Sequence, residues 1–234
     1  MPEARRLLVL RHVPWEGPGL VTTGLQDLPT DDRLVVDETD PDLPRAADLA
    51  GLVVMGGPMG ADDLVEHPGL VAERRILAEA VDAEVPVIGI CLGMQLLACA
   101  LGAPLHRGHG TEIGLGPVDV LASDPVLDPL GPRPEVLHWH SDAVDLPTGA
   151  ALLASSPSTP VQAFRAGSAL GLQFHLEVDR PLLGAWLAEP AMQADLAAHG
   201  ISGMAEAGDR VLPSLTPAAI LGLSTFAEAV RSRV

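Results

Sequence analysis

The chain has 234 residues, a formal net charge of −17 and a sequence pI near 4.6; 47% of its residues are hydrophobic and 19% are charged. This length and apolar content allow one large folded core and exclude a disordered chain. The negative charge repels phosphate backbones and anionic membrane surfaces, so neither nucleic acid nor a membrane is expected as a partner.

Short apolar runs alternate with helical patterns through the first half of the chain. The run at 51–57 ends in a double glycine, which predicts a tight turn after its strand. The expected elements are strands at 6–12, 33–38 and 51–57, a helix at 67–83, a strand at 86–90 and a helix at 91–101. This alternation predicts a parallel sheet with helices on both faces.

The second half holds closely spaced strand candidates separated by Pro, Gly, Ser and Asp, which favours antiparallel pairing. From Asp179 onward the pattern is helical again. The strand candidates are 112–122, 135–140, 151–156, 160–167 and 168–175, and the helical segments are 180–190, 191–200 and 216–234. We therefore expect one α/β domain whose mixed, largely parallel sheet is flanked by helices.

No segment is typical of an export signal or approaches the roughly 20 apolar residues of a membrane span. Cys91 and Cys99 fall on one predicted helix, roughly 12 Å apart along its axis. A disulfide needs Cα atoms within about 7 Å, so both thiols should be free, which predicts a cytoplasmic protein. We expect Cys99 and the three tryptophans, Trp15, Trp139 and Trp186, to serve core packing.

The residues around Cys91, GICLG, have the form of a nucleophile elbow, in which a nucleophile occupies a strained turn between a strand and a helix. Gly89 and Gly93 would let the two elements approach closely. At a helix N-terminus the backbone dipole favours a thiolate, and the N–H of Leu92 would supply half of an oxyanion hole. From this pattern alone, a nucleophile and a packed core cysteine are equally good interpretations.

Two further motifs stand at predicted strand ends. His175 closes an apolar strand in LGLQFHLEV, and Glu177 follows on the same side of the chain. His175 would serve as the base for Cys91, with Glu177 orienting the imidazole. The GGPMG turn would add a second oxyanion donor, the N–H of Gly57. Because chemistry in parallel sheets sits at the carboxyl ends of the strands, we expect these motifs to share one crevice.

On these motifs the chain resembles the class I glutamine amidotransferases of the Cys-His-Glu type, over roughly residues 7–187. GGPMGADD, GICLGMQLLA and GLQFHLE match the three main motifs of that family in order, and EIG and LHWHSDAVDLP resemble its stand-alone members. The resemblance implies a flavodoxin-like fold, with an amidotransferase domain over 1–190 and a helical extension over 191–234 packed on the same domain.

The resemblance also implies a role for each reactive residue. Cys91 would attack the side-chain carboxamide of glutamine, while His175 accepts the thiol proton and later protonates the departing ammonia. Glu177 would hold the imidazole in the required tautomer. Gly57 and Leu92 would offer backbone N–H groups to the tetrahedral oxyanion, and water would resolve the thioester to glutamate.

A second set of residues is implied for the substrate pocket. The turn at 140–142 would bind the α-carboxylate through main-chain N–H groups. Met59 and Ser141 stand where small residues and glycine are common in the family, which implies a pocket of different breadth. The expected substrate contacts are Gln95, His140, Ser141, Asp142 and Met59.

Several histidines resemble metal ligands without completing a metal site. His106 and His109 lack an acidic or cysteine ligand at zinc spacing, so a solvated turn is the simpler interpretation. His138 and His140 share one face of a strand, but the resemblance assigns them to the glutamine pocket. Glu112 is equally compatible with a place near the substrate amine or on the surface. We expect no metal, and without a lysine for a P-loop no nucleotide cofactor.

Three functions fit the sequence. The leading one is hydrolysis of the glutamine side-chain amide, releasing glutamate and ammonia for an unidentified acceptor. No ATP-binding module is found, so the acceptor site would lie in a separate synthase subunit. The alternatives are a hydrolase of γ-glutamyl peptides and a non-catalytic partner subunit; the intact Cys91, His175 and Glu177 argue against the last.

Overall fold

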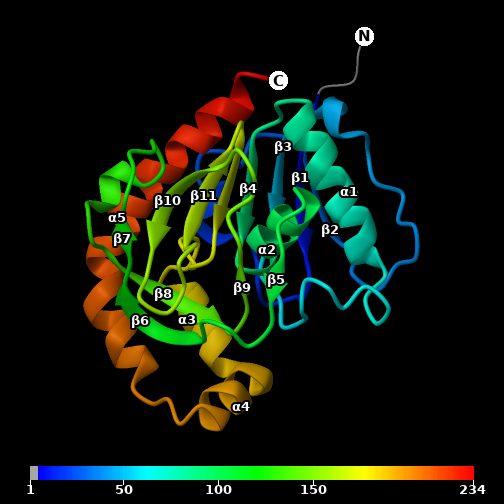
Figure 1. The fold of residues 1–234 in the computed structure, drawn as a ribbon. Helices are drawn as coiled ribbons and strands as arrows, with labels where there is room; N and C mark the ends of the chain where they lie inside the picture. The colour runs from blue at the N-terminus through cyan, green and yellow to red at the C-terminus, as the bar shows by residue number, and fades with distance from the viewer. Residues whose placement is uncertain (1–4) are drawn as a thin grey trace.

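The computed structural model describes residues 5–234, which form one central eight-stranded sheet (Figure 1). Its strands lie in the order β2 (Thr30–Leu34), β1 (Arg6–Arg11), β3 (Leu49–Val54), β4 (Val87–Ile90), β12 (Ala169–Leu172), β11 (Ala163–Ala166), β10 (Ala151–Ser155) and β7 (Asp119–Val120). Neighbours from β2 to β12 pair parallel, and those from β12 to β7 pair antiparallel. The predicted mixed, largely parallel sheet is confirmed.

Two small sheets lie apart from the central one. β6 (Glu112–Pro117) pairs antiparallel with β8 (Glu135–His140), and β5 (Leu105–His106) pairs antiparallel with β9 (Ala143–Val144). The single strand expected over 112–122 is therefore wrong, because β6 and β7 belong to different sheets. Pro117 closes β6 and has no N–H to donate to a further ladder bond.

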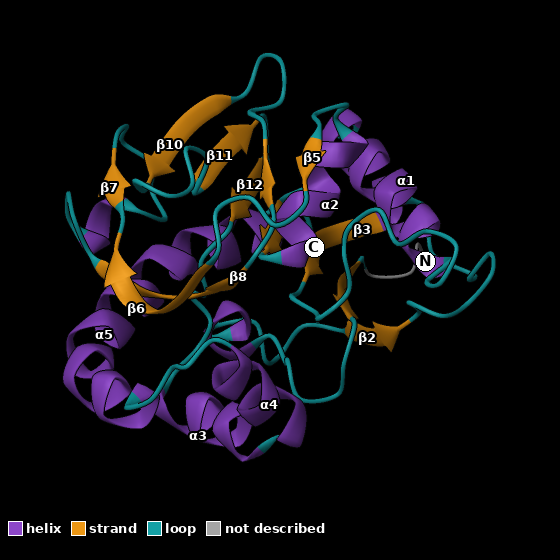
Figure 2. Cartoon of the chain, turned by 60° about the horizontal axis from the view of Figure 1, so that its bottom comes forward, coloured by secondary structure: helices purple, strands orange, loops and turns teal. Residues whose placement is uncertain are grey.

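Helices cover both faces of the central sheet (Figures 1 and 2). α1 (Gly69–Asp82) and α2 (Leu92–Ala100) pack together on one face, and α3 (Arg180–Ala188), α4 (Pro190–Ala198) and α5 (Met204–Arg231) gather on the other side. Three short 3-10 helices complete the described elements: η1 (Gly19–Thr22), η2 (Ala46–Asp48) and η3 (Asp128–Leu130).

The two faces of the sheet carry separate hydrophobic clusters. In β1, Leu7 and Val9 join the cluster that α5 covers, while Leu8 and Leu10 join the cluster under α1. This division follows from the strand geometry, since successive side chains point to opposite faces. A strand buried on both faces therefore appears in the sequence as a continuous apolar run.

The strand expected over 33–38 is misplaced. The true strand, β2, is the polar segment TDDRL, and it pairs only with β1 at the edge of the sheet. An edge strand tolerates exposed polar residues, so it lacks the apolar run of a central strand. Val35 and Val36 are buried beyond its end, where Val36 O accepts a hydrogen bond from the Gly69 N–H at the start of α1.

The C-terminal helix begins earlier than the expected segment at 216–234. α5 starts at Met204 and continues through Pro213 and Pro217. A proline inside a helix costs about 3 kcal/mol, because it removes a hydrogen-bond donor and clashes with the preceding turn. Burial of the apolar face of α5 offsets this cost; the buried residues include Val211, Leu212, Leu215, Ala219, Leu223, Phe226 and Val230.

By length and composition alone α5 could cross a membrane, so the expectation that no segment reaches this threshold is wrong for α5. A core helix passes the same test, and α5 packs against the sheet. A side chain at Gly51 of β3 would lie 2.6 Å from Val230 Cγ2. This one helix is therefore weak evidence for a membrane span. The division of the chain at residue 190 stays a prediction.

Candidate active site

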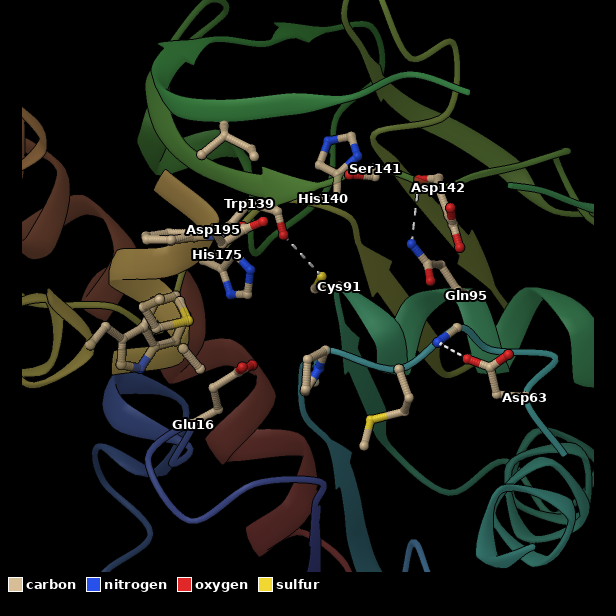
Figure 3. Close-up of a pocket in the computed structure, with 18 of the residues that line it drawn as sticks. Glu16, Asp63, Cys91, Gln95, Trp139, His140, Ser141, Asp142, His175 and Asp195 are labelled. Carbon is tan, nitrogen blue, oxygen red and sulfur yellow. Dashed lines mark hydrogen bonds between the residues drawn. The ribbon is translucent and has the colours of Figure 1, made fainter. Parts of the chain in front are cut away.

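Cys91 occupies the junction between β4 and α2 in a strained conformation, with φ of 53° and ψ of −108°. A positive φ is costly for a residue with a side chain, and a nucleophile elbow requires such a turn. The thiol donates a hydrogen bond to the carbonyl oxygen of Trp139 over 3.6 Å (Figure 3). The structure thus places Cys91 at the strand end where the motif predicts it.

Gly89 and Gly93 permit the close packing that holds this turn. A Cβ atom on Gly93 would lie 2.0 Å from the carbonyl oxygen of Val54, and one on Gly89 would lie 2.6 Å from the carbonyl oxygen of Gly93. Both distances are far shorter than atoms tolerate, so only glycine fits at either position. α2 therefore lies directly against β3 and β4, and the position of Cys91 is fixed by backbone packing.

His175 follows β12 and lies close to Cys91. Its Nδ1 is 2.7 Å from Glu177 Oε1, and both side chains are buried. Burial lowers the pKa of His175, but the Glu177 carboxylate and the Cys91 thiol outweigh it and raise this pKa well above its ordinary value. A Cβ atom on Gly56 would lie 3.2 Å from His175 Cε1 and 3.6 Å from Cys91 Cβ. Thiol, imidazole and carboxylate therefore converge.

The two expected oxyanion donors are free backbone N–H groups. Within residues 5–234, neither Gly57 nor Leu92 donates its N–H to another group. His12 Nδ1 lies 2.8 Å from the carbonyl oxygen of Gly56, and its Nε2 lies 2.9 Å from Glu73 Oε2. Because the N–H and C=O of a peptide point in opposite directions, His12 also fixes the direction of the Gly57 N–H.

The His12–Glu73 pair is completely buried. Burial lowers the pKa of His12, but the Glu73 carboxylate and the Gly56 carbonyl more than compensate, so the pKa is raised. A protonated His12 donates from both ring nitrogens, which satisfies both contacts at once.

A cavity of about 600 Å³ contains most of the expected site residues (Figure 3). Leu92 and Glu177 do not line it; Leu92 would act through its N–H, and Glu177 lies behind His175. The expected residues in its wall are Gly57, Met59, Cys91, Gln95, His140, Ser141, Asp142 and His175.

Gln95 and Asp142 support the turn at 140–142 as well as lining the cavity. Gln95 Nε2 donates to the Asp142 carbonyl oxygen over 3.3 Å and to Gln173 Oε1 over 3.1 Å. The Asp142 carboxylate accepts from the Gly108 N–H at 2.8 Å. These bonds hold the turn whose main-chain N–H groups are predicted to bind a carboxylate.

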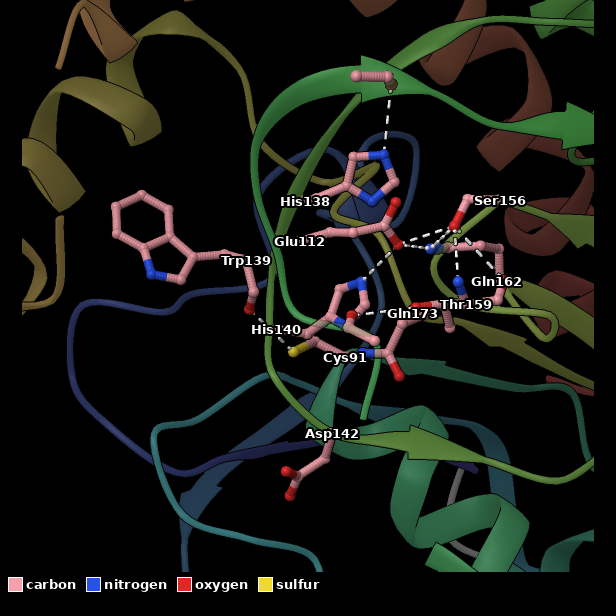
Figure 4. A network of polar contacts seen from close by, with 12 residues as sticks. Cys91, Glu112, His138, Trp139, His140, Asp142, Ser156, Thr159, Gln162 and Gln173 are labelled. Carbon is pink, nitrogen blue, oxygen red and sulfur yellow. Dashed lines mark hydrogen bonds and ion pairs between the residues drawn. The ribbon is translucent and has the colours of Figure 1, made fainter. Parts of the chain in front are cut away.

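Glu112 lies in a buried polar network behind this turn (Figure 4). Its Oε2 accepts from Ser156 Oγ at 2.8 Å and Gln162 Nε2 at 2.6 Å, and lies 3.5 Å from His140 Nε2. Burial raises the pKa of Glu112, but the neighbouring His140 and the Ser156 hydroxyl bring it to about 2. The carboxylate is thus partly buried, lies outside the wall of the cavity, and forms a long ion pair with His140 when that ring is protonated.

Glu112, His138 and His140 also offer ligand atoms that lie within 4.8 Å of one another. Two histidines and a carboxylate are a known zinc-binding set. Burial lowers the pKa of His138 to about 4, so its ring is neutral at neutral pH, and its Nδ1 finds no hydrogen-bond partner among residues 5–234. Sequence spacing did not reveal this grouping, because β6 and β8 bring the residues together. The absence of a metal site stays a prediction.

Sequence analysis missed His12, Glu16 and Glu73. His12 and Glu16 follow the carboxyl end of β1, so the strand-end rule that selected Gly57 and Cys91 would also have selected them. Glu73 had no such signal, because it faces inward from the middle of α1. The three tryptophans were expected only to pack, yet all three line the cavity.

The remaining candidates lie outside the cavity. Cys99 is half-buried against the α1 side of the core, and burial raises the pKa of its thiol. Both cysteines are free, as predicted. His106 Nε2 lies 2.9 Å from Asp145 Oδ1 in a half-exposed pair, and the ring of His109 lies 6.1 Å from that of His106.

Comparison with known proteins decides the family. The sequence model described as "Glutamine amidotransferase class-I" matches residues 30–186. The chain belongs to the class I glutamine amidotransferases. The predicted family and the amidotransferase type of enzyme are thereby confirmed. A crystal structure of a glutamine amidotransferase from Thermotoga maritima has a TM-score of 0.86 and 30% identity, and the match covers 97% of this chain and 99% of that one.

Curated amidotransferase relatives differ in length. The glutamine-hydrolyzing GMP synthase of Thermomicrobium roseum is 34% identical over 155 residues, which are 65% of this chain and 28% of that protein. One subunit of the glutamine-hydrolyzing GMP synthase from Methanosarcina mazei is 32% identical over 168 residues, 70% of this chain and 84% of its own length. This chain spans less than two thirds of the first two curated relatives that it matches.

Proposed function

We propose that the chain hydrolyses the side-chain amide of glutamine through a thioester on Cys91. The observation that carries this proposal is the strained turn that holds Cys91 in the cavity beside the His175–Glu177 pair. The sulfur attacks the carboxamide carbon while His175 takes up the thiol proton. The C–N bond then breaks, and the same proton passes to the departing ammonia.

The N–H groups of Gly57 and Leu92 stabilise the oxyanion of the tetrahedral intermediate. They are preorganised, because packing against Val54 fixes α2 and the hydrogen bond from His12 fixes the peptide before Gly57. Donors fixed in this way need no reorganisation as charge develops. Water then attacks the thioester, with His175 as base, and glutamate leaves.

The released ammonia would pass to an acceptor reaction in a separate synthase subunit. The similarity to single subunits of glutamine-hydrolyzing GMP synthases supports this arrangement. The acceptor itself is not specified by this similarity. A cytoplasmic location stays a prediction.

The test compares Cys91→Ala with Cys99→Ala, since Cys91 precedes α2 and lines the cavity, whereas Cys99 lies within α2 and does not line it. We expect Cys91→Ala to abolish glutamate release from glutamine, while Cys99→Ala retains it. A glutamine-like electrophile such as diazo-oxo-norleucine should label Cys91, located by mass spectrometry. Turnover by folded Cys91→Ala, or an adduct on Cys99, would rule out the mechanism.

A further inference from the structure

The loop after β1 places Glu16 in the wall of the cavity, close to the reactive groups (Figure 3). Glu16 is only 6% exposed. A Cβ atom on Gly56 would lie 2.4 Å from Glu16 Oε2, and the same point is 3.2 Å from His175 Cε1 and 3.6 Å from Cys91 Cβ. Carboxylate, imidazole and cysteine therefore surround one point. The thioester mechanism gives Glu16 no role.

Glu16 lies on the side of Cys91 from which the amine leaves. When the amide C–N bond breaks, the nitrogen takes its proton from His175, so it must face the imidazole. Figure 3 shows His175 and Glu16 on one side of Cys91 and Gln95 and Asp142 on the other. The γ-glutamyl part of a substrate is expected on the side of Gln95. The amine part then points toward Glu16.

This amine side of the cavity has a large apolar surface. Trp15, Trp186 and Met192 contribute to its wall, and the Trp186 ring packs edge-on against His175 at 4.9 Å between ring centroids. Aromatic and thioether groups favour contact with apolar or cationic ligands. Ammonia, with a single heavy atom, gains little from such a surface. A wall of this kind suits a larger amine.

The charge of the cavity favours a cation. Glu16 and Asp195 line it, and within residues 5–234 no group donates a hydrogen bond to the Glu16 carboxylate. The arginine in the wall, Arg107, is already paired with Asp62 and Asp63. Burial raises the pKa of Glu16, and the nearby His175 and His12 offset this effect only in part. A buried carboxylate that accepts no hydrogen bond gains from a positively charged ligand that donates one.

We propose that Glu16, with the apolar wall beside it, forms a binding site for the amine part of a substituted γ-glutamyl amide, and that this amine is cationic. The proposal rests on the proposed function, since the same thioester forms on Cys91. Only the leaving group changes: the C–N bond breaks, the amine takes the proton from His175, and water later releases glutamate. Asp195 on α4, which already accepts a hydrogen bond from Trp139 Nε1 at 2.6 Å, adds a second carboxylate on this side.

The experiment compares three substrates: glutamine, the γ-glutamyl amide of diaminobutane, and the γ-glutamyl amide of pentylamine, its uncharged counterpart of equal length. We expect kcat/KM for the diaminobutane amide to exceed that for the pentylamine amide by about tenfold or more. Glu16→Gln has nearly the same shape and should reduce this ratio to near unity. Asp195→Asn should reduce it less, because Asp195 is partly exposed.

Glu228→Gln is the matched control, because it removes one carboxylate from an exposed position on α5. In this variant, the ratio of kcat/KM for the diaminobutane amide to that for the pentylamine amide should equal the wild-type ratio. Equal turnover of the two amides, or an unchanged ratio in Glu16→Gln, would overturn the binding site. Cleavage of glutamine alone would overturn this inference and leave the proposed function standing. Failure to cleave any of the three, with no labelling of Cys91, would overturn the proposed function itself.

Discussion

The two sides of the cavity are built with different packing. On the sheet side, a Cβ atom on Gly93 of α2 would lie 2.0 Å from a backbone oxygen of β3. On the helical side, α3 and α5 also pack closely, since a Cβ atom on Gly208 would lie 2.4 Å from Leu183 Cδ2, but α4 buries only Met192. The groups proposed for the chemistry thus stand on the closely packed side. The proposed amine site includes Met192 and Asp195 of α4, the helix with little burial.

This difference matches the demands of each task. Thioester chemistry requires fixed distances between sulfur, imidazole and oxyanion donors, and a shift of about 1 Å can cost two orders of magnitude in rate. Recognition of an amine tolerates more variation, because apolar contact is not directional. Substitutions on the sheet side should therefore be the more damaging.

The largest effect is expected for Glu177→Gln. Glu177 is the main group that raises the pKa of His175. The neutral side chain of Gln at this position should lower that pKa, and it should no longer hold the imidazole in one tautomer. We expect kcat/KM for glutamine to fall by about 10³- to 10⁴-fold. The pH dependence of the rate of Cys91 alkylation supplies a second readout. Its midpoint should move to lower pH, because the pKa of His175 is lower. An unchanged pH profile would contradict the pairing.

Gly93→Ala tests the close packing directly. The added methyl group would displace α2 from β3, and we expect a loss of about 3 kcal/mol or more in the free energy of unfolding. Gly184→Ala is the matched control: it also replaces a helical glycine, has room for the methyl group, and should gain about 0.5–1 kcal/mol. Urea denaturation measures both. Similar stability of the two variants would contradict the close packing of Gly93 against β3.

A smaller effect is expected for Glu73→Gln, behind the oxyanion peptide. The substitution removes the negative charge of Glu73 that raises the pKa of His12. We expect this to lower the free energy of unfolding by about 2 kcal/mol near pH 6. A raised folded pKa stabilises the protein fully below the unfolded pKa of His12, and this contribution disappears as the pH rises through the folded pKa. The difference from wild type should therefore shrink as the pH rises above the ordinary pKa of histidine. A difference that grows with pH would contradict a protonated His12.

Sequence patterns predicted the residues whose roles depend on local geometry. Cys91 lies between a strand and a helix with flanking glycines, and each feature is visible within five consecutive residues. His175 and Glu177 likewise stand two residues apart at a strand end. The same reasoning failed for β2, because its polar sequence reflects an edge position that only the sheet order defines. It also placed the start of α5 too late, since burial keeps the helix intact across two prolines.

The sequence by itself determined the family, the mixed sheet and the three motifs, because short-range spacing fixes strand ends, turns and which residues can reach a common edge. Only the tertiary structure decided that Glu16 faces the imidazole, that His12 and Glu73 hold the Gly56 peptide, and that Glu112 joins two histidines. These contacts join residues far apart in the chain. These contacts depend on how strands and helices pack, and no local sequence pattern encodes which distant residues meet.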